Sequence, residues 1–152
     1  MWLNMAREDY QKALKKGERS YARYLSEGKY PYLQVLEELL SHTDVVAEED
    51  LGICSIPSEM IVGTFTAGRR TAFAPNFMPL LDDESEFAAK WQALYNAHLE
   101  EGIHDPIKCY EFMNRYYVLE GNKRVSVLKF CGAPSVQGNV TRIIPKLSRI
   151  HI

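Results

Sequence analysis

The 152-residue chain has no apolar run that approaches the roughly 20 residues needed for a membrane-spanning helix. Its first residues turn polar at once and lack the apolar segment of a secretory signal peptide, so we expect a cytoplasmic protein with no membrane partner. Cysteine is scarce: Cys54, Cys109 and Cys131 are odd in number, far apart and outside any C-x-x-C pair. We therefore expect buried thiols, with no disulfide framework, no metal ligands for zinc and no haem.

Net charge is also small. The formal charge is −2, so the chain as a whole does not have the basic excess typical of nucleic-acid-binding proteins. The charges are unevenly distributed, however. Residues 31–60 contain seven acids and no Lys or Arg, whereas residues 102–152 contain eight Lys or Arg against three acids. This cationic half would attract anions.

The first fifty residues contain two helical patterns. Apolar residues recur at spacings of three and four across 7–25, among several Lys and Arg, which predicts an amphipathic basic helix. Pro31 can occupy the first turn of a second helix through Leu40. Residues 41–50 are polar and acidic and are typical of a linker. We therefore predict a helical extension over residues 1–50.

The remainder of the chain mixes strands and helices and predicts an α+β domain over residues 51–145, followed by a short basic tail over 146–152. The loop 64–79 has neither a helical nor a strand period, yet its aromatic side chains argue against disorder. Asn114 can turn a hairpin because asparagine tolerates a positive φ. The expected elements are a strand at 51–57, a helix capped by 82–86 and ended by Gly102, strands at 107–112 and 116–119, a helix after Gly121, and a strand at 136–144.

The chemistry is concentrated where the strand 116–119 leads into a helix. Gly121 permits a tight turn, and Asn122 is a good N-cap. Such a helix start presents unpaired backbone N–H groups and a positive dipole end, and Lys123 and Arg124 add two cations, which together favour a phosphate site. The alternative is that both cations are ordinary solvated charges and that Asn122 is merely a cap.

A second pair of cations lies in the loop 64–79. Arg69 and Arg70 follow Gly68, and adjacent guanidinium groups on a pinned loop suit bidentate contact with phosphate or carboxylate. The alternative is a surface pair that forms a structural salt bridge. We include both arginines among the candidate phosphate-binding residues.

Two short motifs and the order of elements resemble the bacterial ParB/sulfiredoxin superfamily. The motifs are Gly102-Ile103-His104-Asp105-Pro106-Ile107 and the box Gly121-Asn122-Lys123-Arg124. The resemblance implies an α+β nucleotide-binding fold in which the box holds phosphates, with Arg124 as its main cation and ATP or CTP with Mg²⁺ as ligand. The chain is also similar to the leader module found ahead of basic-membrane-protein-like ligand-binding domains.

The box also departs from the superfamily pattern. Asn122 stands where sulfiredoxins have their catalytic cysteine, and an amide cannot act as a thiolate, so we do not expect sulfinic acid reduction. We find no helix-turn-helix module of the ParB kind, so DNA binding is not expected from this domain alone. The superfamily also includes kinases of free serine, which makes Glu120 a candidate catalytic base. The alternative is that Glu120 forms a salt bridge with Arg124.

The leading hypothesis is therefore a nucleotide- or phosphate-ligand-binding module with an accessory or regulatory role, whose partner is a nucleotide or phosphorylated small molecule. One alternative is an ATP-dependent small-molecule kinase. The other is a nucleic-acid interaction domain of the ParB type, based on the basic half of the chain and the tyrosine-rich basic first helix. The sequence leaves the oligomeric state open.

Overall fold

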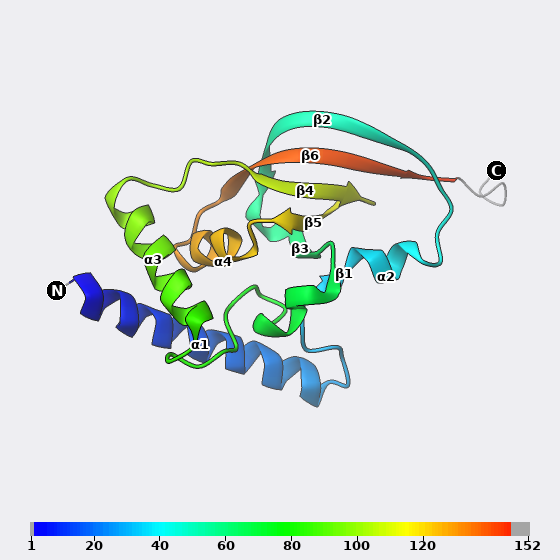
Figure 1. The fold of residues 1–152 in the computed structure, drawn as a ribbon. Helices are drawn as coiled ribbons and strands as arrows, with labels where there is room; N and C mark the ends of the chain where they lie inside the picture. Colours follow the sequence, from blue (N-terminus) through cyan, green and yellow to red (C-terminus); the bar gives the residue numbers. More distant parts are fainter. Residues whose placement is uncertain (1, 147–152) are drawn as a thin grey trace.

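The computed structural model describes residues 2–146, which form a mixed sheet of six strands with helices packed against it (Figure 1). From one edge to the other the strands are β1 (Gln34–Val35), β3 (Ile61–Thr64), β5 (Arg115–Glu120), β4 (Ile107–Phe112), β6 (Ser135–Pro145) and β2 (Val45–Pro57). The helices are α1 (Trp2–Ser26), α2 (Leu36–Leu40), α3 (Glu86–Glu100) and α4 (Asn122–Phe130), with 3₁₀ turns η1 (Ser58–Met60) and η2 (Ala67–Ala72). This composition confirms the expected α+β class.

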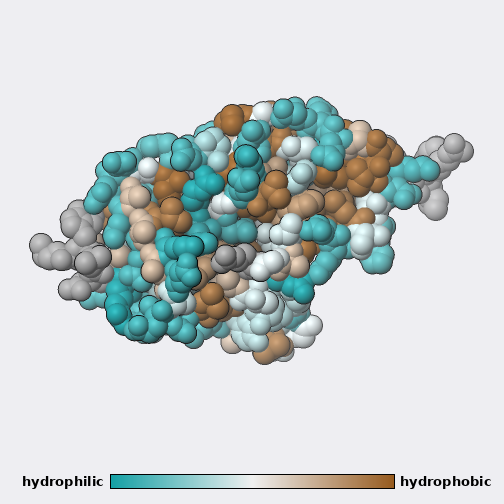
Figure 2. Space-filling view, in the orientation of Figure 1, coloured by the Kyte–Doolittle hydropathy of each residue, from teal (hydrophilic) through white to brown (hydrophobic). Residues whose placement is uncertain are grey.

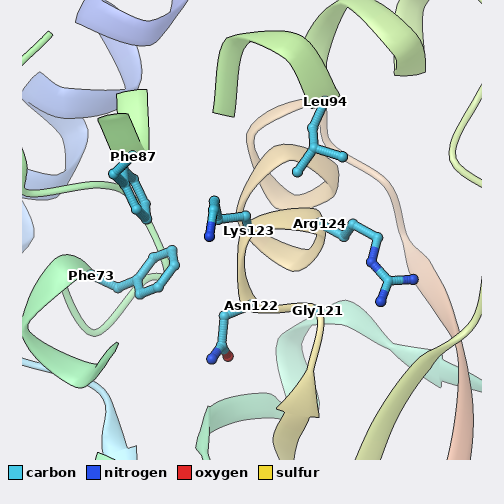
Figure 3. Close-up of a pocket in the computed structure, with 7 residues that line it drawn as sticks. All are labelled: Phe73, Phe87, Leu94, Gly121, Asn122, Lys123 and Arg124. Carbon is cyan, nitrogen blue, oxygen red and sulfur yellow. The ribbon is translucent and has the colours of Figure 1, made fainter. Parts of the chain in front are cut away.

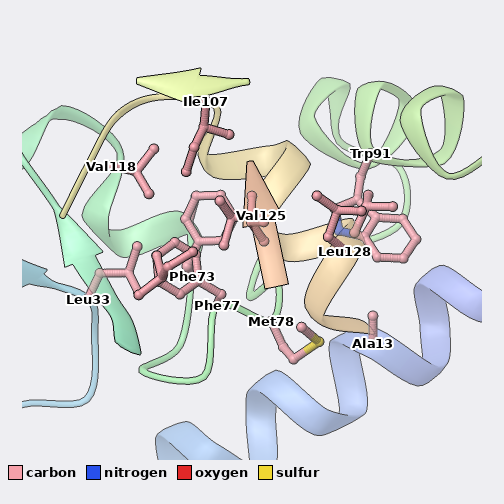
Figure 4. Close-up of a cluster of buried hydrophobic side chains, with 14 of the residues drawn as sticks. Ala13, Leu33, Phe73, Phe77, Met78, Trp91, Ile107, Val118, Val125 and Leu128 are labelled. Carbon is pink, nitrogen blue, oxygen red and sulfur yellow. The ribbon is translucent and has the colours of Figure 1, made fainter. Parts of the chain in front are cut away.

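The helices α1, α3 and α4 lie on one side of the sheet, with α4 between α3 and the strands (Figure 1). Their apolar faces meet the sheet in one buried cluster (Figure 4). Within it, the indole Nε1 of Trp91 on α3 donates a 2.9 Å hydrogen bond to the hydroxyl of Ser126 on α4, and both residues are fully buried. This bond satisfies two polar groups that would otherwise be costly to bury, and it fixes α3 against α4.

The β4–β5 hairpin has the turn that its local sequence predicts. Phe112 pairs with Arg115, so Met113 and Asn114 form a two-residue turn. Both have positive φ, 54° and 64°, which is the conformation that joins two strands with their natural right-handed twist. The backbone N–H of Asn114 also donates to the carboxylate of Glu111 at 2.9 Å. The expected hairpin and the role of Asn114 in it are confirmed.

Helix α3 is confirmed as well. Ser85 is its N-cap, and the serine hydroxyl accepts a 3.0 Å hydrogen bond from the backbone N–H of Ala88. Gly102 follows the helix with a φ of +83°, as expected for a glycine that ends a helix.

The prediction of a linker over residues 41–50 was wrong. Strand β2 begins at Val45, pairs antiparallel with β6 and runs unbroken to Pro57 except for local irregularities in register. Residues 45–50 are all exposed at an edge of the sheet, so they have no buried face to give an apolar alternation. The acids of this stretch fit an exposed edge strand; Glu49, for example, pairs in register with Arg142.

Two further expectations were wrong in detail. The helix expected from Pro31 is restricted to the five residues of α2, because Gln34 and Val35 instead pair with Gly63 and Thr64 as the edge strand β1. The segment 64–79 was expected to be a loop without regular secondary structure, but it contains η2 and an antiparallel bridge between Phe73 and Pro79.

The N-terminal helix shares the core of the domain. Ala6, Tyr10 and Ala13 of α1 are fully buried and belong to the same apolar cluster as Trp91. The hydroxyl of Tyr95 on α3 also donates a hydrogen bond to the carboxylate of Asp9 on α1. The domain boundary that we placed after residue 50 falls within β2, and most of the expected tail lies outside the described residues.

The surface is mainly hydrophilic on the face drawn in Figure 2, where hydrophobic residues form separate areas. Across residues 2–146, no helix combines the length and the apolar character needed to cross a membrane.

Candidate functional site

Helix α4 begins at a position that only glycine fits. Gly121 has a φ of +114°, which side chains rarely adopt. A Cβ at this position would lie 2.7 Å from Cγ2 of Ile107 and 3.1 Å from the guanidinium of Arg124. Gly121 is the N-cap of α4. Because glycine has no side chain, the helix start receives no hydrogen bond from a capping side chain.

Asn122 is the first helical residue, so the prediction that it caps the helix was wrong. Its Nδ2 donates a 3.1 Å hydrogen bond to the hydroxyl of Thr64, which in turn donates to the backbone oxygen of Val118 at 3.2 Å. The Oδ1 atom of Asn122 is buried and has no hydrogen-bond partner among the described residues. The amide thus fastens the start of α4 to the end of β3.

The strand ends converge at this point. Strands β3 and β5 are parallel neighbours, so their carboxyl ends reach the same edge of the sheet. In open α/β sheets ligands bind outside such strand ends. A pocket of about 340 Å³ lies here (Figure 3). It is lined by Phe73, Phe87, Leu94, Gly121, Asn122, Lys123 and Arg124.

The two cations of the box line the pocket from different directions. Figure 3 shows Lys123 directed toward Phe73 and Phe87 and Arg124 directed to the opposite side of the helix start. The Nζ of Lys123 lies 5.4 Å from the ring centroid of Phe87, a cation–π contact. The guanidinium of Arg124 donates to the backbone oxygens of Asp105 and Pro106 at 3.1 and 3.2 Å.

The electrostatic character of the pocket follows from these contacts. The two acceptors that hold Arg124 are neutral carbonyls, and none of the described lining residues is acidic. The helix dipole adds a positive end at the same place. The donors present are suited to a phosphate or another anion, whereas the lining offers Mg²⁺ none of the carboxylates it prefers.

The structure does not bring Arg70 of the loop to this pocket. The guanidinium of Arg70 forms an ion pair with Glu38 of α2 and lies 5.8 Å from the ring centroid of Tyr30. Arg70 is absent from the pocket lining. The side chain of Arg69 lies outside the described part of the structure.

Glu120 also lies outside the pocket lining. Its carboxylate is exposed and lies 3.8 Å from the Nζ of Lys108 on the neighbouring strand β4. It is therefore neither buried in an ion pair with Arg124 nor directed into the same pocket as the box. Of the seven candidate residues, the structure brings together Gly121, Asn122, Lys123 and Arg124.

Sequence reasoning did not identify the other side chains of the site. Phe87 and Leu94 belong to an apolar stripe that predicts the core face of a helix and gives no sign of a pocket. Thr64 and Phe73 belong to the segment 64–79, whose sequence shows neither helical nor strand periodicity. Their position beside α4 depends on the parallel pairing of β3 with β5, which the sequence pattern did not indicate.

Comparison with known proteins identifies no relative. No protein-family model matches the chain, and searches of curated proteins and of solved structures find no match either. Within residues 2–146, no group of three or more His, Cys, Asp or Glu side chains is placed to hold a metal ion.

Proposed function

We propose that the chain is a nucleotide- or phosphate-ligand-binding module and that the pocket at the start of α4 receives a phosphoryl group. The observation that carries the proposal is a glycine-started helix with no side-chain cap, flanked by Lys123 and Arg124 in a pocket whose described lining contains no acid. The resemblance of the box to that of the ParB/sulfiredoxin superfamily points the same way. An accessory or regulatory role fits a site that binds without a catalytic base.

The physical basis is the set of donors at the helix start. The backbone N–H groups of the first turn have no partner within the helix, and a phosphate can accept hydrogen bonds from them. Interaction with the helix dipole contributes about 0.3–1 kcal/mol at an exposed site. A hydrogen bond from a charged group such as Arg124 contributes about 1.5–3 kcal/mol. Several modest contributions therefore add to the free energy of phosphate binding at this site.

The size of the pocket limits the ligand. Its volume of about 340 Å³ is close to the lower end of the roughly 300–1,000 Å³ range of small-molecule pockets. A phosphate with a small adjoining group fits this space, whereas the base of a nucleotide would extend beyond it. Phe73 and Phe87 are almost fully buried, so they offer little free ring surface on which a base could stack.

The geometry supports binding better than phosphoryl transfer. A general base must come within about 3 Å of the hydroxyl it activates, directly or through one water molecule. Glu120 lies outside the described pocket lining and is placed near Lys108. The kinase alternative therefore has less support than the binding module.

Titration calorimetry tests the proposal. ATP, CTP, ADP and pyrophosphate are each titrated into the protein with and without Mg²⁺. We expect saturable heat with at least one of them. No heat with any of the four, in either condition, would count against the proposal.

A further inference from the structure

A second cleft, of about 470 Å³, lies beside the other end of α4. It is bounded by the end of α1, the segment that leads into β1, and the start of β3. Tyr24, Tyr30 and Tyr32 contribute aromatic walls, and Lys129 enters from the last turn of α4. Lys129 is seven residues after Asn122, about 10 Å along the helix, so this tyrosine cleft is separate from the pocket at the helix start.

Lys129 is held by neutral groups. Its Nζ donates to the backbone oxygens of Ser58 and Ile61 at 2.6 and 3.0 Å and lies 5.2 Å from the ring centroid of Phe77. Lys129 forms no ion pair with any residue that the structure describes. Burial without a paired carboxylate lowers the pKa of Lys129 to about 8, although the charge of Glu59 acts to raise it.

The two carbonyls use only part of the hydrogen-bonding capacity of the neutral amine. A neutral amine has two N–H bonds and one lone pair, and the carbonyls of Ser58 and Ile61 can accept both N–H bonds. The lone pair then points away from these two acceptors. A lysine with a pKa near 8 is neutral in an appreciable fraction of molecules near neutral pH, whereas the ordinary pKa of 10.5 keeps the amine almost wholly protonated.

The walls of the cleft indicate the class of ligand. Tyr30 and Tyr32 meet edge to face with ring centroids 5.7 Å apart, and Tyr32 meets Tyr21 in the same manner at 5.5 Å. Such rings pack well against another planar aromatic group. Lys29, whose Nζ lies 3.0 Å from Glu27 and 5.9 Å from the ring centroid of Tyr24, also lines the cleft and supplies a cation for an anionic substituent.

We propose that the tyrosine cleft binds a planar aromatic aldehyde or ketone with an anionic substituent and that Lys129 condenses with its carbonyl group. The lone pair of Nζ attacks the carbonyl carbon, and both amine protons leave with the carbonyl oxygen as water. A C=N bond replaces the C=O bond, and nothing is oxidised or reduced. The ionisable groups that line this cleft with Lys129 are Glu59 on η1, Lys29 and the hydroxyls of the three tyrosines.

The test measures how fast each lysine is modified. The protein is incubated with 4-carboxybenzaldehyde and sodium cyanoborohydride at pH 7.5, and peptide mass spectrometry follows the adduct at every lysine. Lys12 and Lys90 are matched controls because both are exposed and lie near a carboxylate. We expect Lys129 to react at least tenfold faster than either control. Equal or slower reaction at Lys129 would overturn the proposal.

Two further measurements separate a binding site from a merely reactive amine. 4-(Hydroxymethyl)benzoate has the same shape without a carbonyl, and we expect it to protect Lys129 but not Lys12. The rate at Lys129 should rise with pH and reach half its maximum near 8. Modification without protection, or a rate at Lys129 with no midpoint near pH 8, would contradict the proposal. Neither measurement depends on phosphate binding at the other end of α4.

Discussion

Asn122 and Thr64 are 58 residues apart in the sequence and are joined by a 3.1 Å hydrogen bond from the amide Nδ2 to the threonine hydroxyl. Thr64 is almost completely buried at the end of β3, and Asn122 is the first residue of α4. The bond therefore fixes the start of the helix relative to the sheet. The orientation of the N–H groups that we assign to a phosphate depends on this connection.

Replacing Thr64 by valine should weaken the fold. Thr64→Val keeps the size of the side chain but leaves Nδ2 of Asn122 and the oxygen of Val118 without this hydroxyl. An unsatisfied buried polar group costs about 1–3 kcal/mol, so we expect the free energy of unfolding in urea to fall by that amount. Thr66→Val is the control because Thr66 is exposed two residues later, and it should change the stability by less than about 0.5 kcal/mol. Equal stability of the two variants would contradict this role for Thr64.

Gly121→Ala should also destabilise the protein. The new Cβ would meet Ile107 at 2.7 Å, and the φ of +114° would be strained in any residue with a side chain. We expect a loss of about 1–3 kcal/mol in the free energy of unfolding. Gly68→Ala is the matched control, since a Cβ there meets no atom within 4 Å. If both variants unfold at the same urea concentration, the conformation described for Gly121 is incorrect.

Gly17→Ala tests whether α1 is part of the domain. A Cβ at Gly17 would lie 2.2 Å from the backbone oxygen of Pro79, so α1 must shift away from the loop before α3. Overpacking of this kind costs about 1–3 kcal/mol, and we expect a lower melting temperature. Lys15→Ala, an exposed position on the same helix, should leave the melting temperature almost unchanged. A helix that only extended from the domain would tolerate both changes.

The pH dependence of stability should reveal Lys129. Its pKa is about 8 in the folded protein and 10.5 in the unfolded chain, so between these values the unfolded chain binds more protons. The contribution of Lys129 to stability must then rise as the pH increases from about 8 toward 10.5. We expect the unfolding free energy of the wild type, taken relative to that of Lys129→Met, to increase from pH 7.5 to pH 9.5. A constant difference would show that the lysine titrates normally.

Several elements could be predicted because their signals are local. The positive φ of Asn114, the hydroxyl cap of Ser85 and the glycine that starts α4 each depend on a few neighbouring residues. Strand β2 was expected too short because its first half is exposed and shows no apolar alternation. The role of Asn122 was predicted wrongly because an N-cap and a first helical residue differ by a single position. The φ of Gly121 makes Gly121 the N-cap and Asn122 the first residue of the helix.

The candidate site was predictable only where it is continuous in the sequence. The box from Gly121 to Arg124 lines the pocket as one segment. Arg70 was included because it lies beside Arg69 on a pinned loop, and the sequence could not indicate that Glu38 and Tyr30 lie beside it. Thr64 and Phe73 reach α4 only through strand pairing and a folded loop, and contacts of that kind leave no periodic pattern.

Arg124→Ala should weaken the binding of any phosphate ligand by about 1.5–3 kcal/mol, because it removes a charged hydrogen-bond donor from the pocket. Arg115→Ala removes the same charge from the opposite end of β5 and should leave the affinity unchanged. Calorimetry measures both affinities, and circular dichroism establishes that each variant is folded. Unchanged affinity in a folded Arg124→Ala variant would place the ligand elsewhere.

The most direct measurement is a titration of ¹⁵N-labelled protein with pyrophosphate, followed through the backbone amide resonances. If a phosphoryl group binds at the start of α4, the amides of Asn122, Lys123 and Arg124 should shift progressively and saturably, because their N–H groups become hydrogen-bond donors to it. The amide of Arg115, at the far end of β5, should stay in place. Absence of any saturable shift at residues 122–124, or shifts confined to α1, would contradict the account.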